Sequence, residues 1–236
     1  MSVLVIMPTY NELANLERSI ENVRLAQPQV HILVVDDKSP DGTGALADQI
    51  AARDAQVQVL HRSKKDGLGG AYLAGFSWAF ERGFETLVEM DADGSHRAED
   101  LGKLLAQTGR ADLVIGSRWV KGGAVQNWPW YRRAISRTGT FYADLMLGSR
   151  VKDMTAGFRA FDAEFLKRLN LEGIAARGYG FQVEMAWRTQ KAGGTIIEVP
   201  ITFVERTEGA SKMTTAIVLE ALWLVTKWGV SRRLGL

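Results

Sequence analysis

The sequence predicts an α/β fold with a mostly parallel sheet flanked by helices, and three observations lead to it. In the first half of the chain, short apolar runs rich in β-branched residues alternate with segments whose apolar residues recur at helical spacing. Continuous apolar strands are typical of a parallel sheet that helices cover on both faces. A polar cluster follows each of five runs, where ligands bind in such sheets. No linker or second core interrupts the 236 residues, which therefore predict one domain.

Each element is expected from its local pattern. The apolar runs predict five strands, at residues 3–7, 31–35, 57–61, 86–90 and 112–115. The segments with helical spacing predict four helices, at residues 12–26, 44–53, 68–82 and 98–107. The second half is less regular, and there we expect helices at 133–147 and 181–192 and a strand at 195–199. Segment 122–132, which contains Gly, Pro and Trp, and the polar segment 205–213 are expected to be loops.

The composition excludes several classes of protein. The chain has no cysteine, which excludes disulfides and thiolate metal sites and agrees with a reducing cytoplasm. Its formal net charge of +2 is too small to indicate a nucleic-acid partner. The N-terminus lacks the basic and apolar blocks of a signal peptide, and no apolar run reaches the roughly 18 residues of a membrane span. We therefore expect a cytoplasmic protein that does not cross a membrane.

The acidic triplet Asp91-Ala92-Asp93 directly follows the fourth expected strand. Two carboxylates this close repel each other unless a cation or hydrogen bonds compensate. Oxygen ligands suit a hard divalent cation such as Mg²⁺ or Mn²⁺, which often bridges the phosphates of a substrate. Ser95 is a candidate third ligand, directly or through water. The alternative is a solvated turn whose acids cap the next helix.

Other polar groups follow the remaining strands. Asp37, after the second strand, can accept hydrogen bonds from a base or a ribose, although the segment also reads as the capped start of a helix. The glycine-containing segment 67–70 precedes a helix and can bind anions through backbone N–H groups, or serve only as a flexible turn. Basic residues in the loops each read as surface charges, but beside a divalent cation they predict a site for more than one phosphate. They are Arg118, Arg132, Arg133, Arg206 and Lys212.

Seven stretches of the chain together resemble the glycosyltransferase family 2 proteins that include the dolichol-phosphate and polyprenol-phosphate mannose synthases, the actinobacterial ones above all. They are 8–12 (PTYNE), 36–43 (DDKSPDGT), 67–69 (GLG), 90–96 (MDADGSH), 116–118 (GSR), 178–184 (GYGFQVE) and 211–213 (SKM). The similarity covers nearly the whole chain and implies a GT-A fold. We divide this single domain into a nucleotide-sugar half (1–118), an acceptor half (119–213) and an amphipathic helix at a membrane surface (214–236).

The resemblance also implies a donor, GDP-mannose, and an acceptor, a polyprenyl phosphate. The implied donor-binding residues are Pro8, Tyr10, Glu12, Val35, Asp37, Asp91, Ala92, Asp93, Arg118, Arg206 and Lys212. The implied acceptor-phosphate residues are Arg118, Arg132, Arg206 and Lys212. Mg²⁺ or Mn²⁺ would bind Asp91, Asp93 and Ser95, where many family members carry Gln in place of Ser95. Asp91, Asp93 and Arg118 are the expected catalytic residues.

A phosphate acceptor removes the need for a general base. The second pKa of a phosphate monoester lies near roughly 6, so the acceptor is largely dianionic at neutral pH and is already a nucleophile. Its attack opposite the leaving diphosphate would invert the anomeric carbon. Glu184 lies where related transferases often place a base, and we expect it to orient the sugar or an arginine.

The apolar stretch 217–230 is too short to span a membrane and too apolar for an ordinary exposed helix. It predicts an amphipathic helix in the membrane interface, with Arg232 and Arg233 at headgroup level and Trp128 and Trp130 joining the contact. A helix packed on the domain core explains the pattern equally well. Peripheral attachment to the cytoplasmic face would suit a polyprenyl acceptor, and the need for a membrane partner protein stays open.

Three other functions stay open. A related transferase that uses another nucleotide sugar, such as UDP-glucose, would carry the same motifs. A nucleotidyltransferase also joins acids and a metal in an α/β crevice, but no glycine-rich loop follows the first strand here. A catalytically idle nucleotide-binding module would have no use for the acids and the basic residues together.

Overall fold

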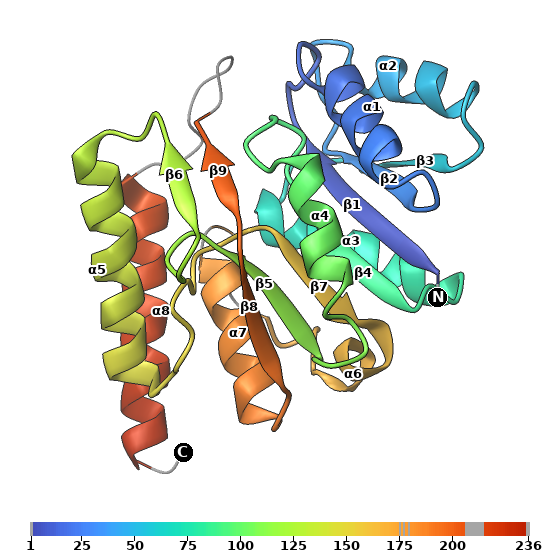
Figure 1. Cartoon of the computed structure of the whole chain (residues 1–236). Coiled ribbons are helices and arrows are strands. Elements are labelled where there is room, and N and C mark those ends of the chain that lie inside the picture. The colour runs from blue at the N-terminus through green and yellow to red at the C-terminus, as the bar shows by residue number, and fades with distance from the viewer. Residues whose placement is uncertain (1, 175, 177, 179, 206–214, 235–236) are drawn as a thin grey trace.

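The computed structural model describes residues 2–174, 176, 178, 180–205 and 215–234. It confirms the predicted α/β fold, in which a seven-stranded sheet of order β3-β2-β1-β4-β7-β5-β8 lies between helices, and β6 pairs with β9 in a second sheet (Figure 1). The strands are β1 (Val3–Thr9), β2 (His31–Asp36), β3 (Val57–His61), β4 (Thr86–Glu89), β5 (Leu113–Ser117), β6 (Ala124–Gln126), β7 (Arg159–Asp162), β8 (Ile196–Pro200) and β9 (Thr202–Val204). The helices are α1 (Leu16–Ala26), α2 (Thr43–Ala51), α3 (Gly67–Glu81), α4 (Ala98–Leu105), α5 (Trp130–Leu147), α6 (Ala163–Arg168), α7 (Gly180–Lys191) and α8 (Thr215–Leu234).

The main sheet is parallel except at one strand. β1 pairs in parallel with β2 and with β4, so that Ile6 lies opposite Leu33 on one side and Glu89 on the other. β2 with β3 and β5 with β8 are also parallel pairs. β7 runs antiparallel to both of its neighbours, β4 and β5. Because β1, β2, β4 and β5 point the same way, their carboxyl ends meet at one edge of the sheet.

The sequence prediction missed β7, α6 and β9 and misplaced some boundaries. β7 has only four residues and begins with Arg159, so no apolar run in the sequence indicates a strand there. The Arg159 side chain is nevertheless fully buried, because three backbone carbonyls accept hydrogen bonds from its N–H groups. The expected loop 122–132 contains β6, and α5 begins at Trp130 because Pro129 fits a helix start. α1 begins at Leu16 and not at Glu12, whose carbonyl accepts hydrogen bonds from the first turn.

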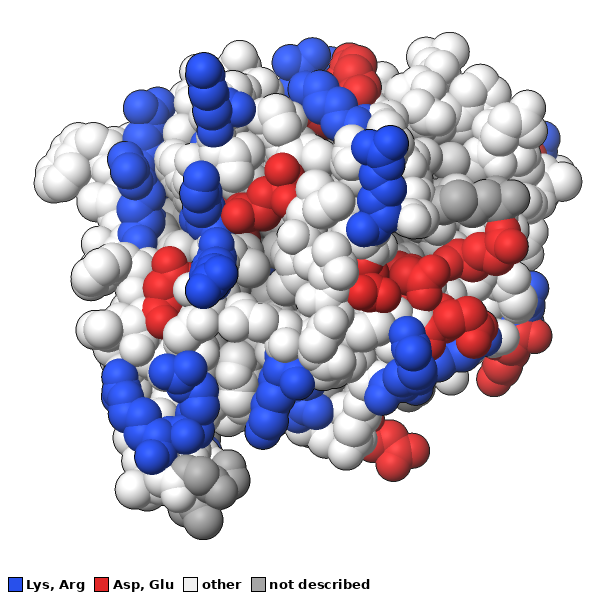
Figure 2. Space-filling view, turned by 60° about the horizontal axis from the view of Figure 1, so that its bottom comes forward, with Lys and Arg blue, Asp and Glu red and all other residues white. Residues whose placement is uncertain are grey.

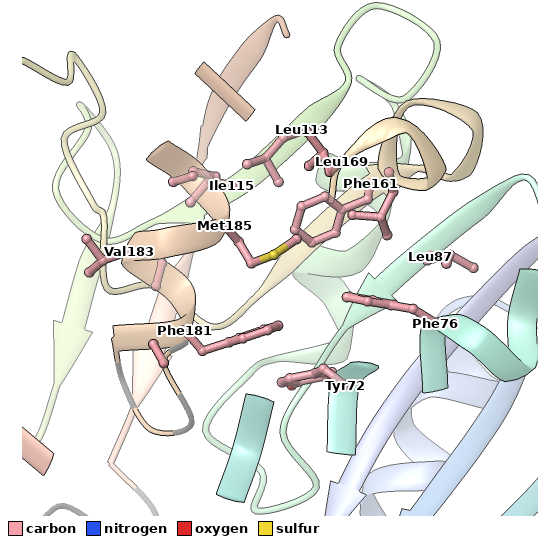
Figure 3. Close-up of a cluster of buried hydrophobic side chains, with 14 of the residues drawn as sticks. Tyr72, Phe76, Leu87, Leu113, Ile115, Phe161, Leu169, Phe181, Val183 and Met185 are labelled. Atoms are coloured by element: carbon pink, nitrogen blue, oxygen red, sulfur yellow. The ribbon is translucent and has the colours of Figure 1, made fainter. Parts of the chain in front are cut away.

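Two hydrophobic cores lie on opposite faces of the sheet. Successive side chains of a strand point to opposite faces, so Ile6 joins one core while Val5 and Met7 join the other. α3, α5, α6, α7 and α8 cover the first face, and α1, α2 and α4 cover the second. Figure 3 shows the first core, where Tyr72 of α3 stacks on Phe181 of α7 with ring centroids 6.0 Å apart. This core joins the two halves of the chain beneath the carboxyl edge of the sheet.

The C-terminal helix α8 uses two faces. Leu224 is buried and Trp228 stacks on Trp187 of α7, with ring centroids 5.4 Å apart, so one face packs on the core. Leu219 and Trp223 lie on another face and are 61% and 62% exposed. The structure therefore confirms the predicted C-terminal helix. Its apolar side chains lie on two faces, one packed on the core and one exposed, and not on a single face. No helix in the described part of the chain is long and apolar enough to cross a membrane.

Candidate active site

The carboxyl ends of the parallel strands bring the predicted polar groups to one edge of the sheet. The N–H of Asp37, after β2, donates to the carbonyl of Thr9 at the end of β1 over 3.0 Å. Asp91 and Asp93 follow β4, and Arg118 follows β5. The two acids and the arginine line the same cavity. Segments that are far apart in the sequence therefore meet as the strand order requires.

This cavity has a polar end and an apolar end. Asp91, Asp93, Arg118 and Arg132 line its polar end. Another part of its wall comes from α5 and α8, where mostly apolar residues accompany Ser136. They are Ile135, Gly139, Tyr142, Ala143, Val218, Ala221, Leu222 and Val225. The shape suits a ligand with an anionic group and a long apolar group.

The acidic triplet is held by its surroundings. The Tyr72 hydroxyl donates to Oδ1 of Asp91 over 3.4 Å, and the Asp91 N–H donates to Nδ1 of His96 over 3.0 Å. Burial, and next to it the charge of Asp91, raise the pKa of Tyr72 well above its usual value, so this hydroxyl keeps its proton. Asp93 Oδ1 accepts the N–H of Ser95 over 3.0 Å. The triplet is thus a defined turn with both carboxylates facing the cavity.

The same turn can hold a divalent cation. Ser95 is buried, its hydroxyl has no partner among the described residues, and it lines the same cavity as Asp91 and Asp93. The described residues contain no cluster of three His, Cys, Asp or Glu side chains. A cation here would therefore complete its shell with oxygens from a substrate or from water, as Mg²⁺ commonly does. His96 stacks on Phe158 with ring centroids 5.0 Å apart and bonds the backbone, so its role is structural.

A buried charged pair lies behind the triplet. Glu89 of β4 is opposite Arg159 of β7, and both side chains are fully buried. Burial raises the pKa of Glu89 to about 7, against the opposing effect of the Arg159 charge. Burial likewise lowers the pKa of Arg159 to about 10. Desolvation therefore dominates over pairing at both groups.

Arg118 is more constrained than its sequence context indicates. Its Nε and Nη2 donate to the carboxylate of the fully buried Asp153 over 2.8 and 2.6 Å, and Nη2 also donates to Thr155 over 2.8 Å. The guanidinium carbon lies 5.2 Å from the ring centroid of Trp128. Within the described residues, only Nη1 of this side chain has no hydrogen bond. Asp153 could not be predicted from the sequence, because a lone acid in an irregular loop carries no local signal.

Arg132 lines the cavity and forms an ion pair with Glu205. Its guanidinium lies 4.8 Å from the ring centroid of Trp128. Trp128 is 9% exposed and lines the cavity, so the expectation that it joins a membrane contact is wrong, whereas Trp130 is 79% exposed. Arg133 does not line this cavity, and it donates instead to the carbonyl of Val125 over 3.3 Å.

The expected nucleotide-binding residues meet at the ends of β1 and β2. Arg62 Nη1 donates to Asp37 Oδ1 over 2.5 Å, and burial raises the pKa of Asp37 although Arg62 opposes the rise. The Lys65 ammonium lies 3.7 Å from the ring centroid of Tyr10. The neighbouring Asp41 accepts the N–H of Thr43 at the start of α2, so Asp41, and not Asp37, bonds the first turn of this helix.

The remaining residues that were predicted to bind the donor are mostly buried, and several of them bond neighbouring parts of the protein. Pro8 and Val35 pair across β1 and β2, and the Val35 side chain lies in the core, which leaves its backbone for a ligand. Ala92 is buried, and its carbonyl accepts the Ser19 hydroxyl over 2.8 Å. Glu12 is buried, and its N–H donates to Thr43 over 3.0 Å. Arg206 and Lys212 lie outside the described residues.

Glu184 is not a surface carboxylate. It is fully buried on α7, its Oε1 accepts Arg188 Nη2 over 2.6 Å, and its Oε2 accepts the N–H of Ala176 over 3.0 Å. It does not line the cavity. The expectation that it orients an arginine fits this geometry.

Comparisons with known proteins show the family of the chain. A family model described as Glycosyl transferase family 2 matches residues 4–169. An undecaprenyl-phosphate mannosyltransferase of Micrococcus luteus is 55% identical over 233 residues, which cover 99% of this chain and 96% of the relative. A polyprenol monophosphomannose synthase of Mycolicibacterium smegmatis is 52% identical, covering 98% and 88%.

Solved structures give the same fold. Glucosyl-3-phosphoglycerate synthase of Mycobacterium tuberculosis, in complex with Mn²⁺ and UDP-glucose, superposes with a TM-score of 0.68 over 98% of this chain and 78% of that one. At 20% sequence identity, this likeness shows the fold alone. The family match and the two close relatives confirm the resemblance drawn from the motifs. The chain therefore belongs to glycosyl transferase family 2 and is a glycosyltransferase.

Proposed function

We propose that this enzyme transfers mannose from GDP-mannose to a polyprenyl phosphate and inverts the anomeric carbon. The observation that carries the proposal is the single cavity that joins two carboxylates and two arginines to an apolar groove between α5 and α8. A lipid phosphate needs both surroundings, because its headgroup is anionic and its chain is apolar. The names of the two close relatives, which refer to polyprenyl-phosphate mannosylation, support the same acceptor and sugar.

In this proposal residues 1–118 bind the nucleotide sugar. Tyr10, Glu12 and Asp37 hold the guanosine part at the ends of β1 and β2, with backbone contacts from Pro8 and Val35. Arg62 already pairs with Asp37 and fixes the direction of its carboxylate. UDP-glucose is the alternative donor, since nothing in this arrangement selects one base over the other by charge.

Mg²⁺ or Mn²⁺ fits the oxygen atoms of Asp91, Asp93 and Ser95. When bound, the cation supplies a Lewis acid that neutralises charge on the leaving diphosphate. The protein's own part is to present the carboxylates in fixed positions, which the Tyr72 hydroxyl and the Ser95 N–H do by hydrogen bonding. The unpaired Ser95 hydroxyl then gains a partner, either the cation or a water bound to it.

Residues 119–213, together with Arg118, bind the acceptor. Arg118 and Arg132 hold its phosphate, and Arg206 and Lys212 are assigned to the same phosphates by resemblance. Asp153 orients Arg118 so that Nη1 is left for the ligand. The dianionic phosphate attacks without a general base, and Glu184 is unsuited to that role because Arg188 and the Ala176 N–H already occupy its oxygens.

The acceptor places the enzyme at a membrane surface, which we propose is the cytoplasmic face. Large exposed apolar side chains gather on two helices that pack side by side at one edge of the molecule (Figure 1). They are Trp130, Tyr131, Ile135, Phe141 and Leu145 of α5, and Leu219, Leu222, Trp223, Val230 and Leu234 of α8. Figure 2 shows Lys and Arg side chains along this side of the molecule, while most Asp and Glu side chains lie on the other. Apolar helices flanked by basic residues fit the interface of an anionic bilayer.

Product analysis tests the proposed function. The protein is mixed with Mg²⁺ or Mn²⁺, a polyprenyl phosphate and radiolabelled GDP-mannose or UDP-glucose, and the lipid fraction is separated by chromatography. We expect a mannosyl lipid that forms only with GDP-mannose, acceptor and metal together. No labelled lipid from GDP-mannose would overturn the proposal, and a glucosyl lipid alone would establish the alternative donor.

A further inference from the structure

A second pocket lies next to the active-site cavity, and the function proposed above does not use it. It lies between segment 118–125, which leads from β5 into β6, and helix α5, which supplies Arg133 and Arg137 to its wall. Arg118 lines both the cavity and this pocket. None of the described residues that line the pocket is acidic. We call it the arginine pocket.

The two arginines of α5 carry positive charge without an acidic partner among the described residues. Both side chains are exposed. Arg132 pairs with Glu205, whereas neither Arg133 nor Arg137 forms an ion pair within the part of the chain that the structure describes. They lie four residues apart on the helix, and like charges at that spacing destabilise it. An anion bound between them would offset this repulsion.

Contacts hold both arginines at the pocket and leave them N–H groups for a ligand. Arg133 Nη2 donates to the carbonyl of Val125 over 3.3 Å. The guanidinium carbon of Arg137 lies 5.8 Å from the ring centroid of Trp119, which lines the same pocket. A guanidinium group has five N–H donors, so these contacts do not exhaust either side chain. The pocket has a volume of about 430 Å³, against about 30 Å³ for one water, so it has room for a phosphate group with its ester substituents.

The strip of α5 that carries these arginines also carries large aromatic side chains. Trp130, Arg133, Arg137 and Phe141 follow one another at spacings of three, four and four residues, which places them along one strip of the helix. Trp130 and Phe141 are 79% and 68% exposed and belong to the apolar side chains that we assign to the membrane surface. Trp and Arg side chains are typical of the headgroup level of a bilayer. The arginine pocket therefore opens where lipid phosphates would lie.

We propose that the arginine pocket binds the phosphate of an anionic phospholipid of the bilayer through Arg133 and Arg137. The inference rests on the membrane-surface part of the proposed function and not on the choice of donor or acceptor. Guanidinium groups bind phosphate oxygens bidentately, which suits a defined pocket better than a diffuse attraction. A phospholipid held there would fix α5, and with it the active-site cavity that the same helix lines, against the leaflet that supplies the acceptor.

Vesicle binding by the full chain tests the pocket without any transfer reaction. Sedimentation at physiological ionic strength measures the affinity of the wild type and of the double variant Arg133→Gln, Arg137→Gln. The vesicles consist of phosphatidylcholine alone or of equal parts of phosphatidylcholine and phosphatidylglycerol. We expect the variant to bind the anionic vesicles roughly tenfold more weakly than the wild type, because two phosphate-binding groups are lost. Its affinity for the neutral vesicles, which depends on the apolar side chains, should not change.

Two further variants separate a pocket from a diffuse attraction. The control Arg18→Gln, Arg53→Gln removes the same charge from exposed side chains on α1 and just after α2, which lie on the other side of the molecule from α5 and α8 (Figure 1). It should bind anionic vesicles as the wild type does. The variant Arg133→Lys, Arg137→Lys keeps the charge but not the bidentate geometry, and it should bind them roughly threefold more weakly.

Three results would overturn the proposal. The first is wild-type affinity of Arg133→Gln, Arg137→Gln for anionic vesicles. The second is an equal loss of affinity in the control. The third is wild-type affinity of the lysine variant, which would leave only attraction between surface charges.

The acceptor is the competing occupant of the pocket. Neutral vesicles with a small share of a polyprenyl phosphate should bind the glutamine variant as they bind the wild type, since Arg118 and Arg132 line the cavity assigned to the acceptor. A loss of affinity with polyprenyl phosphate and not with phosphatidylglycerol would overturn the proposal and assign the pocket to the acceptor. A wild type that binds neither phospholipid vesicle would refute the membrane-surface placement together with this inference. Failure to form a mannosyl lipid would leave the vesicle result unchanged, so the two failures are distinguishable.

Discussion

The acidic turn and the phosphate-binding arginines are held in different ways. At the turn, Asp93 accepts the N–H of Ser95, two residues away, and the Asp91 N–H donates to His96, five residues away, beside longer-range bonds from Tyr72 and Ser19. Each arginine is held by one acid that is far away in the sequence: Arg118 pairs with Asp153, 35 residues away, and Arg132 with Glu205, 73 residues away. The acidic turn therefore keeps part of its geometry through bonds within itself, whereas the arginines depend on segments that meet only in the folded protein.

The largest expected effect tests the acidic turn. Asp93→Ala should lower turnover about a thousandfold, because the cation loses a charged ligand, and it should leave the fold intact because Asp93 is only partly buried. Steady-state assays and circular dichroism measure the two effects. Asp48→Ala is the control, since its partner His61 lies at the surface away from the cavity. Turnover within tenfold of wild type would refute metal binding at this turn.

Removing the acid that holds Arg118 should lower activity and stability together. Asp153→Asn leaves the buried Arg118 without its charge partner, and such changes cost about 3–5 kcal/mol. Denaturant unfolding and acceptor KM measure the two losses. In the double variant Arg118→Met, Asp153→Leu, most of the lost stability should return, because two apolar side chains leave no unpaired charge buried. Turnover of the acceptor should not return in this variant. Recovery of turnover in the double variant would show that Arg118 does not touch the substrate.

This contrast explains what could be read from the sequence. The strands and helices of residues 1–118 could be predicted because each apolar run or helical pattern is local, and the triplet 91–93 follows directly from the strand before it. β7 could not be predicted, because it begins with a charged residue, Arg159. This side chain can be buried only because three backbone carbonyls outside the strand accept hydrogen bonds from its guanidinium group. Asp153 and Glu205 could not be predicted as partners of the arginines, since these contacts exist only once distant segments have met.

The two halves should also differ in the pH dependence of their acids. The Gln56 N–H lowers the pKa of Asp54 in the donor half, whereas burial and then the charge of Glu198 raise the pKa of Asp144 in α5 to about 6. The folded state thus binds a proton at Asp144 more tightly than the unfolded state, so this residue costs stability increasingly as pH rises from about 4 through 6.

Asp144→Asn removes that cost. Above pH 7 the variant should be more stable by about 1 kcal/mol, or about 2–4 °C in Tm, and below pH 4 the difference should vanish. Melting curves of wild type and variant between these limits measure it. A constant offset at every pH would show that Asp144 does not titrate in this range.

The smallest expected effect concerns Arg132. Glu205→Gln should free this arginine for the acceptor phosphate and lower the acceptor KM about threefold, a modest change because the ion pair is partly exposed. The KM for GDP-mannose should not change. Glu164→Gln, which breaks a surface pair with Lys167 on α6, is the matched control. A higher acceptor KM would mean that Glu205 positions Arg132 and does not compete with the substrate.

We infer that one cavity serves both the charged reaction centre and the lipid chain, and a substitution at Gly139 tests this inference. Gly139 lines the apolar part of the cavity, and a Cβ added to it meets no atom within 4 Å. Gly139→Phe should fill that space and raise the KM for a long polyprenyl phosphate about tenfold or more. The KM for GDP-mannose should stay unchanged in this variant. Gly139→Ala, the control, should behave like the wild type. An unchanged acceptor KM in a folded Gly139→Phe enzyme would contradict the claim.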